Sequence, residues 1–267
     1  MSTTRMLIGC VLLATTAACD SATSPSGSRV GLSFTGVRPA GVAAGFSAPS
    51  ANANVSGNGS ANAIGDSLSI TDGTNTLIIT RVEVVAREIE LRRVGVASCD
   101  STASTDDCEY FSTAAQLVVL PLSQAATQVL TIDVAPGTYS SVRMKVHKVS
   151  DDVGDAAFLA ANPSWPSRQS IRVTGFYNGS AFTYLSDVNF HAEESLAPNL
   201  VVDATTSTNL TVRIDLTVWF RNGATGPLIN PATAGSSGTN KSLVENNIKD
   251  SVKMFEDKDR DGDERDG

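Results

Sequence analysis

Acidic residues at alternating positions near the C-terminus are the motif in this sequence that points most directly to chemistry. The segment reads Asp257-Lys258-Asp259-Arg260-Asp261-Gly262-Asp263. Carboxylates at the first, third and fifth positions, followed by glycine at the sixth, match the first half of an EF-hand-type calcium loop. Calcium prefers several hard oxygen ligands, and alternating residues can converge on one ion because glycine permits a sharp turn. The residue types therefore predict a calcium site at Asp257, Asp259, Asp261 and Asp263.

A solvated acidic tail is the competing interpretation of the same residues. The acid that completes an EF-hand loop would stand at residue 268, beyond Gly267, and Lys258 and Arg260 weaken the negative field. Residues 257–267 would then keep the protein soluble without binding a metal. We favour the solvated tail and retain calcium as the alternative.

Two cysteines in the body of the chain, Cys99 and Cys108, lie nine positions apart in a stretch rich in Ser, Thr and Asp. In an oxidising compartment two nearby cysteines most simply form a disulfide. Two thiols with no neighbouring histidine make a poor zinc site. We therefore predict a Cys99–Cys108 disulfide in a solvated loop, with the acidic residues Asp100, Asp106, Asp107 and Glu109 around it.

The two tryptophans are candidates for a ligand platform. Trp165 lies in a proline-rich loop, and Trp219 falls on the polar face of a predicted strand. Exposed aromatic rings on a β-sandwich can stack on sugars or anchor a protein partner. The alternative, which we favour, is that Trp219 faces a second sheet and Trp165 closes one end of the sandwich.

The sequence lacks the motifs of the common hydrolases. It contains no Gly-x-Ser-x-Gly elbow, no phosphate-binding glycine loop and no His-Glu-x-x-His helix. Its two histidines, His147 and His191, are expected to be exposed strand residues. We therefore predict that the protein is not an enzyme.

The first residues predict export and a lipid anchor. Residues 6–18 form an apolar stretch that is too short to cross a membrane. The small residues before Cys19 resemble the lipobox of bacterial lipoproteins, in which the cysteine is lipidated. Thr16 stands where that motif usually has leucine, so a secretory signal cut near Ala18 is the alternative. We expect residues 1–18 to be a lipoprotein signal peptide.

Residues 19–65 read as the anchored tether that follows this signal peptide. They are rich in Ser, Ala, Gly and Asn and carry few charges. A coil of this length spans about 35–40 Å. Apolar residues alternate at positions 30–34, which predicts a short strand inside the tether.

Residues 66–256 predict one β-rich domain. Asn178-Gly179 is a strong hairpin signal, and a shift in the alternation predicts a bulge near Ala86. The spacing favours seven to nine strands and contains no βαβ alternation, which is typical of an all-β, antiparallel β-sandwich. Strands are expected within residues 77–96, 130–134, 142–146, 171–177, 182–184, 188–192 and 210–220.

Two short helices are expected beside these strands. Asp155 can cap a helix over residues 156–161. Ser242 and Glu245 form a capping box for a helix near the C-terminus. The apolar face of that helix would carry Val244, Ile248, Val252 and Phe255.

Part of the chain resembles a known family. The segment Ile70-Thr71-Asp72-Gly73, the strand over residues 79–91, and Ala135-Pro136-Gly137-Thr138-Tyr139 with Arg143 are similar to domain-of-unknown-function family 4382. The similarity covers about residues 67–149. It implies a β-rich domain of envelope proteins, commonly lipoproteins, and it carries no known reaction or catalytic residue.

Charge and composition narrow the function. A net charge of −8 argues against nucleic-acid binding, and 41% hydrophobic residues are enough for a real core. We expect an exported protein anchored by lipid to the outer membrane or cell surface. It would act as a binding or adhesion module with a glycan or an envelope protein as its partner. Calcium would modulate this module under the alternative in which the aspartate motif binds the ion. The alternative is a structural or assembly component of the envelope that binds no small ligand.

Overall fold

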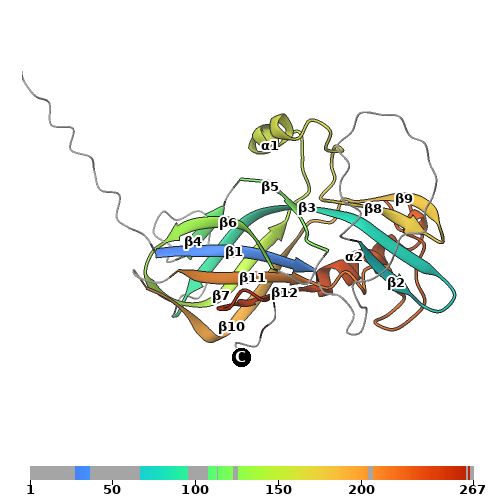
Figure 1. Cartoon of the computed structure of the whole chain (residues 1–267). Coiled ribbons are helices and arrows are strands. Elements are labelled where there is room, and N and C mark those ends of the chain that lie inside the picture. The colour runs from blue at the N-terminus through green and yellow to red at the C-terminus, as the bar shows by residue number, and fades with distance from the viewer. Residues whose placement is uncertain are drawn as a thin grey trace, which may run out of the picture.

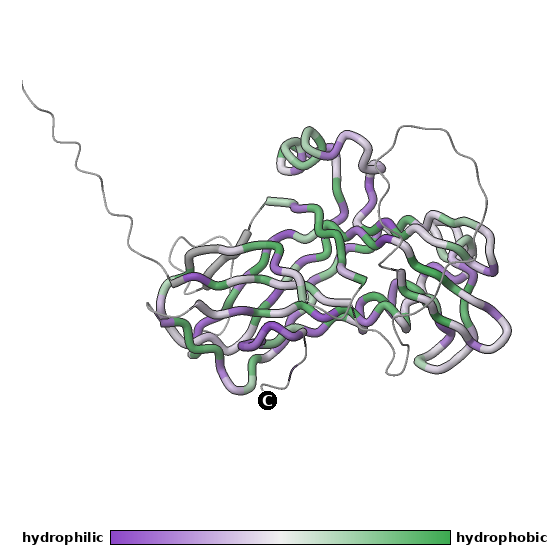
Figure 2. Tube along the Cα trace, in the orientation of Figure 1, coloured by the Kyte–Doolittle hydropathy of each residue, from purple (hydrophilic) through white to green (hydrophobic). Residues whose placement is uncertain are grey.

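The computed structural model describes residues 28–36, 67–95, 108–112, 114–122, 126–203, 207–262 and 264. In these residues the chain forms two β-sheets around a shared apolar core, with short helices beside them (Figure 1). Apolar and polar stretches alternate along the strands (Figure 2). The predicted all-β sandwich with a short C-terminal helix is confirmed. The described strands number twelve, more than predicted, because several are too short to show an alternation of their own.

The smaller sheet has the strand order β12-β11-β1-β6. Its central strand β1 runs parallel to β11 and antiparallel to β6. The strand expected at residues 30–34 is therefore present, and it belongs to the sandwich and not to a tether. The folded domain thus includes residues well before position 66. The strand bounds are β1 Ser28–Gly36, β6 Thr127–Val134, β11 Thr208–Ile214 and β12 Val252–Glu256.

The larger sheet is built along β3, Thr76–Arg93, which runs the length of the molecule (Figure 1). One edge of β3 pairs in turn with β2, β5 and β4, and the other pairs with β8 and then β7. On that second edge, β9 pairs with β8 and β10 pairs with β7. The bounds of these strands are β2 Leu68–Thr71, β4 Cys108–Ser112, β5 Gln116–Val119, β7 Gly137–Val146, β8 Ile171–Tyr177, β9 Ser180–Ser186 and β10 Phe190–Val202.

Two local predictions in the larger sheet are confirmed. The register between β3 and β7 shifts between Arg87 and Glu90, and Glu88 has a φ of 52°, so a bulge lies close to the expected position. Asn178 and Gly179, with φ of 50° and 80°, turn β8 into β9. Two consecutive residues with positive φ match the twist of antiparallel strands, which is why Asn-Gly suits this position.

The strand predicted over residues 210–220 is wrong beyond Ile214. Asp215 accepts hydrogen bonds from the backbone nitrogen and the hydroxyl of Thr217, at 2.9 and 2.6 Å. Such a side-chain turn competes with strand pairing and ends β11. The apolar residues after this turn still enter the core, because Leu216, Trp219 and Phe220 are buried in the irregular segment that follows.

The C-terminal helix is shorter than predicted. α2 spans Lys241–Asp250 and buries Val244 and Ile248, as expected. Val252 and Phe255 belong instead to β12, whose backbone pairs with the edge strand β11. The predicted capping box is also wrong, because the helix begins after Asn240 and Glu245 pairs with Lys241 at 3.0 Å.

The first helix has its predicted bounds, and Asp155 stands at the N-cap position, but the side chain of Asp155 makes no capping hydrogen bond. A short 3₁₀ turn, Val153–Asp155, leads into α1, which spans Ala156–Ala161 directly after Asp155. A second 3₁₀ turn, Pro231–Thr233, precedes α2. Neither of the helices in the described residues is long and apolar enough to cross a membrane.

Asp187 ties α2 to the larger sheet. It lies between β9 and β10 and accepts hydrogen bonds from Lys241 Nζ at 2.7 Å and from Lys148 Nζ at 3.0 Å. These two bonds lower the pKa of Asp187 to about 2. Because the pKa is lower in the folded than in the unfolded state, this carboxylate stabilises the fold above about pH 4.

We predict that Asp187→Asn lowers the free energy of unfolding at pH 7 by about 1 kcal/mol, since it removes a partly exposed charge pair. The difference from wild type should shrink as the pH falls from about 4 to about 2. Urea unfolding of both proteins at several pH values measures this difference in the free energy of unfolding. Asp151→Asn, at an exposed aspartate, is the control. A difference that stays constant with pH would contradict the assignment.

Candidate metal centre

The C-terminal aspartates leave the sandwich directly from a paired strand. β12 lies along β11, and the pairing continues one residue past it, because Asp257 N donates to Asn209 O at 3.0 Å. The side chain of Asp257 is 0% exposed. The element that leads into the motif is therefore a strand, and not the C-terminal helix whose face was expected to extend to Phe255.

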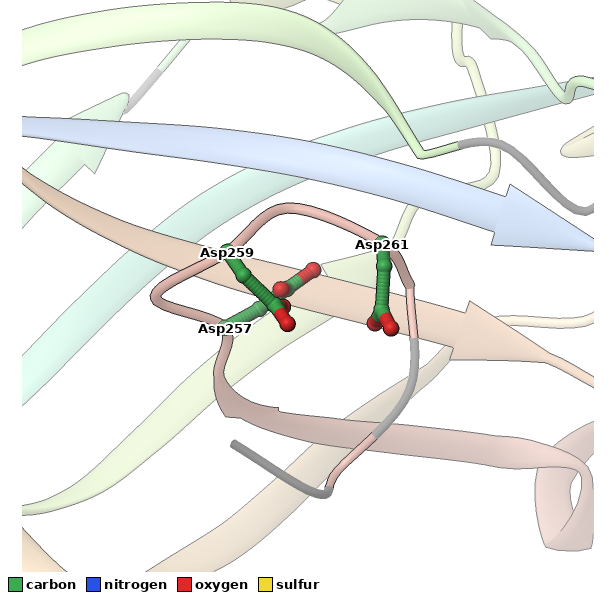
Figure 3. A group of neighbouring side chains, drawn as sticks. All are labelled: Asp257, Asp259 and Asp261. Carbon is green, nitrogen blue, oxygen red and sulfur yellow. The ribbon is translucent and has the colours of Figure 1, made fainter. Parts of the chain in front are cut away.

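Three of the four predicted ligand residues come together in the segment 257–262, which we call the aspartate loop. Asp257, Asp259 and Asp261 each offer a carboxylate oxygen, and these oxygens lie within 4.8 Å of one another. Figure 3 shows the three carboxylates gathered around one space above β11. Asp259 and Asp261 are exposed to solvent, and Asp263 lies outside the described residues.

Backbone geometry in the loop brings these side chains together. Arg260 and Gly262 have φ of 62° and 87°, so the chain reverses within a few residues. The nitrogen of Gly262 donates to Asp257 Oδ2 at 3.2 Å and closes the loop. Glycine adopts positive φ without strain, as the sequence motif predicted for this position.

The two oxygens of Asp257 have different surroundings. Oδ2 accepts from Thr211 Oγ1 at 2.6 Å and from the nitrogen of Gly262. Oδ1 is buried and has no hydrogen-bond partner among the described residues. No lysine or arginine of the described chain forms a salt bridge with Asp257 either. A buried carboxylate in this state costs considerable free energy unless a cation compensates it.

A buried polar network holds Asp257 in place. Ser33 Oγ donates to Asn209 Oδ1 at 2.9 Å, and Asn209 Nδ2 donates to Thr211 Oγ1 at 3.2 Å. Thr211 in turn donates to Asp257, so each bond points from β1 toward the carboxylate. All four side chains are at most 3% exposed. Hydrogen-bonded partners of this kind orient carboxylates that bind metals.

This arrangement suits a hard divalent cation. Oxygens around one Ca²⁺ lie about 2.3–2.6 Å from the ion, so ligand oxygens fall within about 5 Å of one another. Carboxylates are the ligands that calcium prefers, and three of them are present here. The competing solvated tail is contradicted at Asp257, because a solvated segment does not bury its first aspartate.

Both tryptophans are buried, as the favoured interpretation predicted, and the ligand platform considered at these rings is wrong. Trp165 is 5% exposed and packs edge-to-face on Phe158, and its Nε1 donates to Gln169 O at 3.1 Å. Trp219 is 1% exposed, and its Nε1 donates to Ser251 Oγ at 2.8 Å. Neither ring has a free face, because both indoles fill apolar clusters and satisfy their single donor inside the fold.

The histidines form no hydrolase arrangement in the described residues. His191 is exposed as expected, but His147 is buried and its Nε2 lies 2.9 Å from both oxygens of Asp155. Ser150 Oγ bonds to that same Asp155 at 3.0 Å and not to the imidazole. Burial raises the pKa of Asp155, but hydrogen bonds from Ser150 and His147 outweigh it and leave the pKa below its ordinary value.

Several predicted features lie outside the described residues. These are the signal peptide at residues 1–18, the lipidation site Cys19, and Cys99. Only the backbone of Cys108, in β4, is described. The lipid anchor and the Cys99–Cys108 disulfide therefore stay predictions.

Comparison of the chain with protein-family models, with curated proteins and with solved structures finds no match. The resemblance of residues 67–149 to domain-of-unknown-function family 4382 is thus a prediction, and the site rests on its own geometry.

We predict that Asp257→Asn has opposite effects with and without calcium. In a chelator, the amide removes a buried charge that has no cation partner, so the free energy of unfolding should rise by about 1–3 kcal/mol. When calcium is present at 100 times its Kd, the free energy of unfolding of wild type should rise by about 2.7 kcal/mol, and that of the variant should not change. Urea unfolding in the two conditions measures both effects, with Asp151→Asn as the control. A variant less stable than wild type in chelator would refute this account of Asp257.

Proposed function

We propose that this protein is an exported, non-catalytic β-sandwich module that binds calcium through the aspartate loop. The observation that carries the proposal is the fully buried carboxylate of Asp257, which lies close to the carboxylates of Asp259 and Asp261. Its Oδ1 has no hydrogen-bond partner among the described residues. A cation at this point compensates the buried charge and the mutual repulsion of three acidic groups.

The predicted location of the protein, outside the cytoplasm, suits a protein that binds calcium. The N-terminal segment and Cys19 predict export and lipid anchoring in the cell envelope. Extracellular calcium modules bind with Kd of about 10⁻⁴–10⁻³ M, within reach of a site with three carboxylates. The predicted signal peptide and the aspartate loop thus both support a calcium-binding protein of the cell envelope.

A structural role in the envelope fits the geometry better than glycan adhesion. A glycan-binding role depended on Trp165 and Trp219, and both rings are buried. The aspartate loop instead contacts β11 of its own domain through Thr211. We therefore propose that calcium stabilises the domain that the lipid anchor presents.

Calorimetric titration of the whole exported protein with CaCl₂ tests the proposal. We expect saturable binding with a Kd of about 10⁻⁴–10⁻³ M, and weaker binding of Mg²⁺, which demands stricter octahedral geometry. Asp259→Asn should raise the Kd for calcium about tenfold or more, a loss of about 1.4 kcal/mol.

The matched control for this titration is Asp151→Asn, which removes the same charge at an exposed position away from the loop and should leave the Kd unchanged. Absence of saturable heat at about ten times the highest expected Kd would refute the site. Equal weakening by both variants would show that calcium responds only to net charge.

A further inference from the structure

The strand β1 connects the predicted anchor to the sandwich. Eight residues separate Cys19 from Ser28, the first residue of β1. The strand lies between β6 and β11, and its apolar side chains Val30, Leu32 and Phe34 are at most 1% exposed. A pull on the N-terminal segment would therefore act on β1 before any other described strand.

The outer face of β1 reaches the aspartate loop through the buried polar network of Ser33, Asn209, Thr211 and Asp257. In the parallel register, Ser33 pairs with Thr211 and Gly31 with Asn209, so these residues share one face. A Cβ atom at Gly31 would lie 3.0 Å from Asn209 Oδ1, which shows how closely this side chain crosses β1. Asn209 is the bridge, since it bonds to Ser33 on one strand and to Thr211 on the other.

We propose that calcium at the aspartate loop controls how firmly β1 is held in the smaller sheet; this inference rests on the calcium site proposed above. With calcium bound to Oδ1, Asp257 keeps Oδ2 directed at Thr211. The hydroxyl of Thr211 then points away from Asn209 and offers its oxygen to the amide, which leaves Asn209 Oδ1 to accept from Ser33. In this state the hydroxyl of Ser33 donates to Asn209, the amide of Asn209 donates to Thr211, and the hydroxyl of Thr211 donates to Asp257.

Without calcium, repulsion among Asp257, Asp259 and Asp261 opposes the closed loop. When the carboxylate of Asp257 moves, Thr211 loses its acceptor and Asn209 loses the orientation that Ser33 requires. The bonds of the network then weaken together, because each orients the next. Calcium thereby strengthens the connection between the lipid-anchored segment and the domain.

Hydrogen exchange of the whole exported protein tests this coupling. Amides in residues 28–36 should exchange at least about fivefold more slowly in saturating calcium than in chelator, the low end of ordinary coupling between sites. Amides of β8 and β9, which lie in the other sheet, are the internal control and should change less. Calcium binding with unchanged exchange in β1 would overturn the coupling and leave the calcium site intact.

A variant remote from the ligands gives a second readout. Ser33→Ala removes one donor from β1, and by reciprocity it should raise the Kd for calcium about fivefold. Ser170→Ala is the matched control, because Ser170 is equally buried and donates one bond, to Ser186 O, in the larger sheet. Equal calcium affinity in Ser33→Ala and wild type would overturn the coupling. Failure of wild type to bind calcium would overturn the site as well.

Discussion

The smaller sheet depends on β1, because in the described chain β6 and β11 are joined in that sheet through this strand. β1 comes from the N-terminal part of the sequence, whereas β11 and β12 come from its last quarter. The pairing of β1 with β11 is parallel, so no tight turn can hold the two strands together. Side-chain contacts must therefore stabilise this pairing in addition to the backbone hydrogen bonds. The apolar residues of β1 and the hydroxyl of Ser33 supply such contacts.

The buried carboxylate of Asp257 is the second constraint, and it explains the loop that follows β12. One oxygen is held by Thr211 and Gly262, while the other is shielded from water without a partner among the described residues. An isolated buried charge destabilises a fold. Two more carboxylates beside this charge add electrostatic repulsion, which a cation in the space between them would offset. The arrangement that is costly for the protein alone would supply three carboxylate ligands to the calcium ion that we propose.

The remaining polar clusters have structural explanations. The imidazole of His147, the carboxylate of Asp155 and the hydroxyl of Ser150 fasten the start of α1 to the end of β7. Asp187 and its two lysines fasten α2 to the larger sheet. Both oxygens of the Asp155 and Asp187 carboxylates have hydrogen-bond partners inside the fold, whereas Oδ1 of Asp257 has none among the described residues. That contrast separates a candidate ligand site from ordinary ion pairs.

The sequence by itself determined the features that depend on local patterns. Alternation of apolar residues predicted the β-class and β3 with its bulge, Asn178-Gly179 predicted its hairpin, and the spacing of aspartates predicted which residues converge. These follow from backbone periodicity and from residues that tolerate positive φ. The aspartate motif even placed glycine at the turn that closes the loop.

Only the tertiary structure decided where these elements go. The edge of β11 decides that residues 252–256 form a strand and that Asp257 is held against the sheet, because its backbone pairs with this segment. Trp219 is buried because its ring packs in the core and its Nε1 donates to Ser251. Ser33, Asn209 and Thr211 looked like ordinary polar positions on two strands. Their role arises from the contact of segments 176 residues apart, which no local pattern encodes.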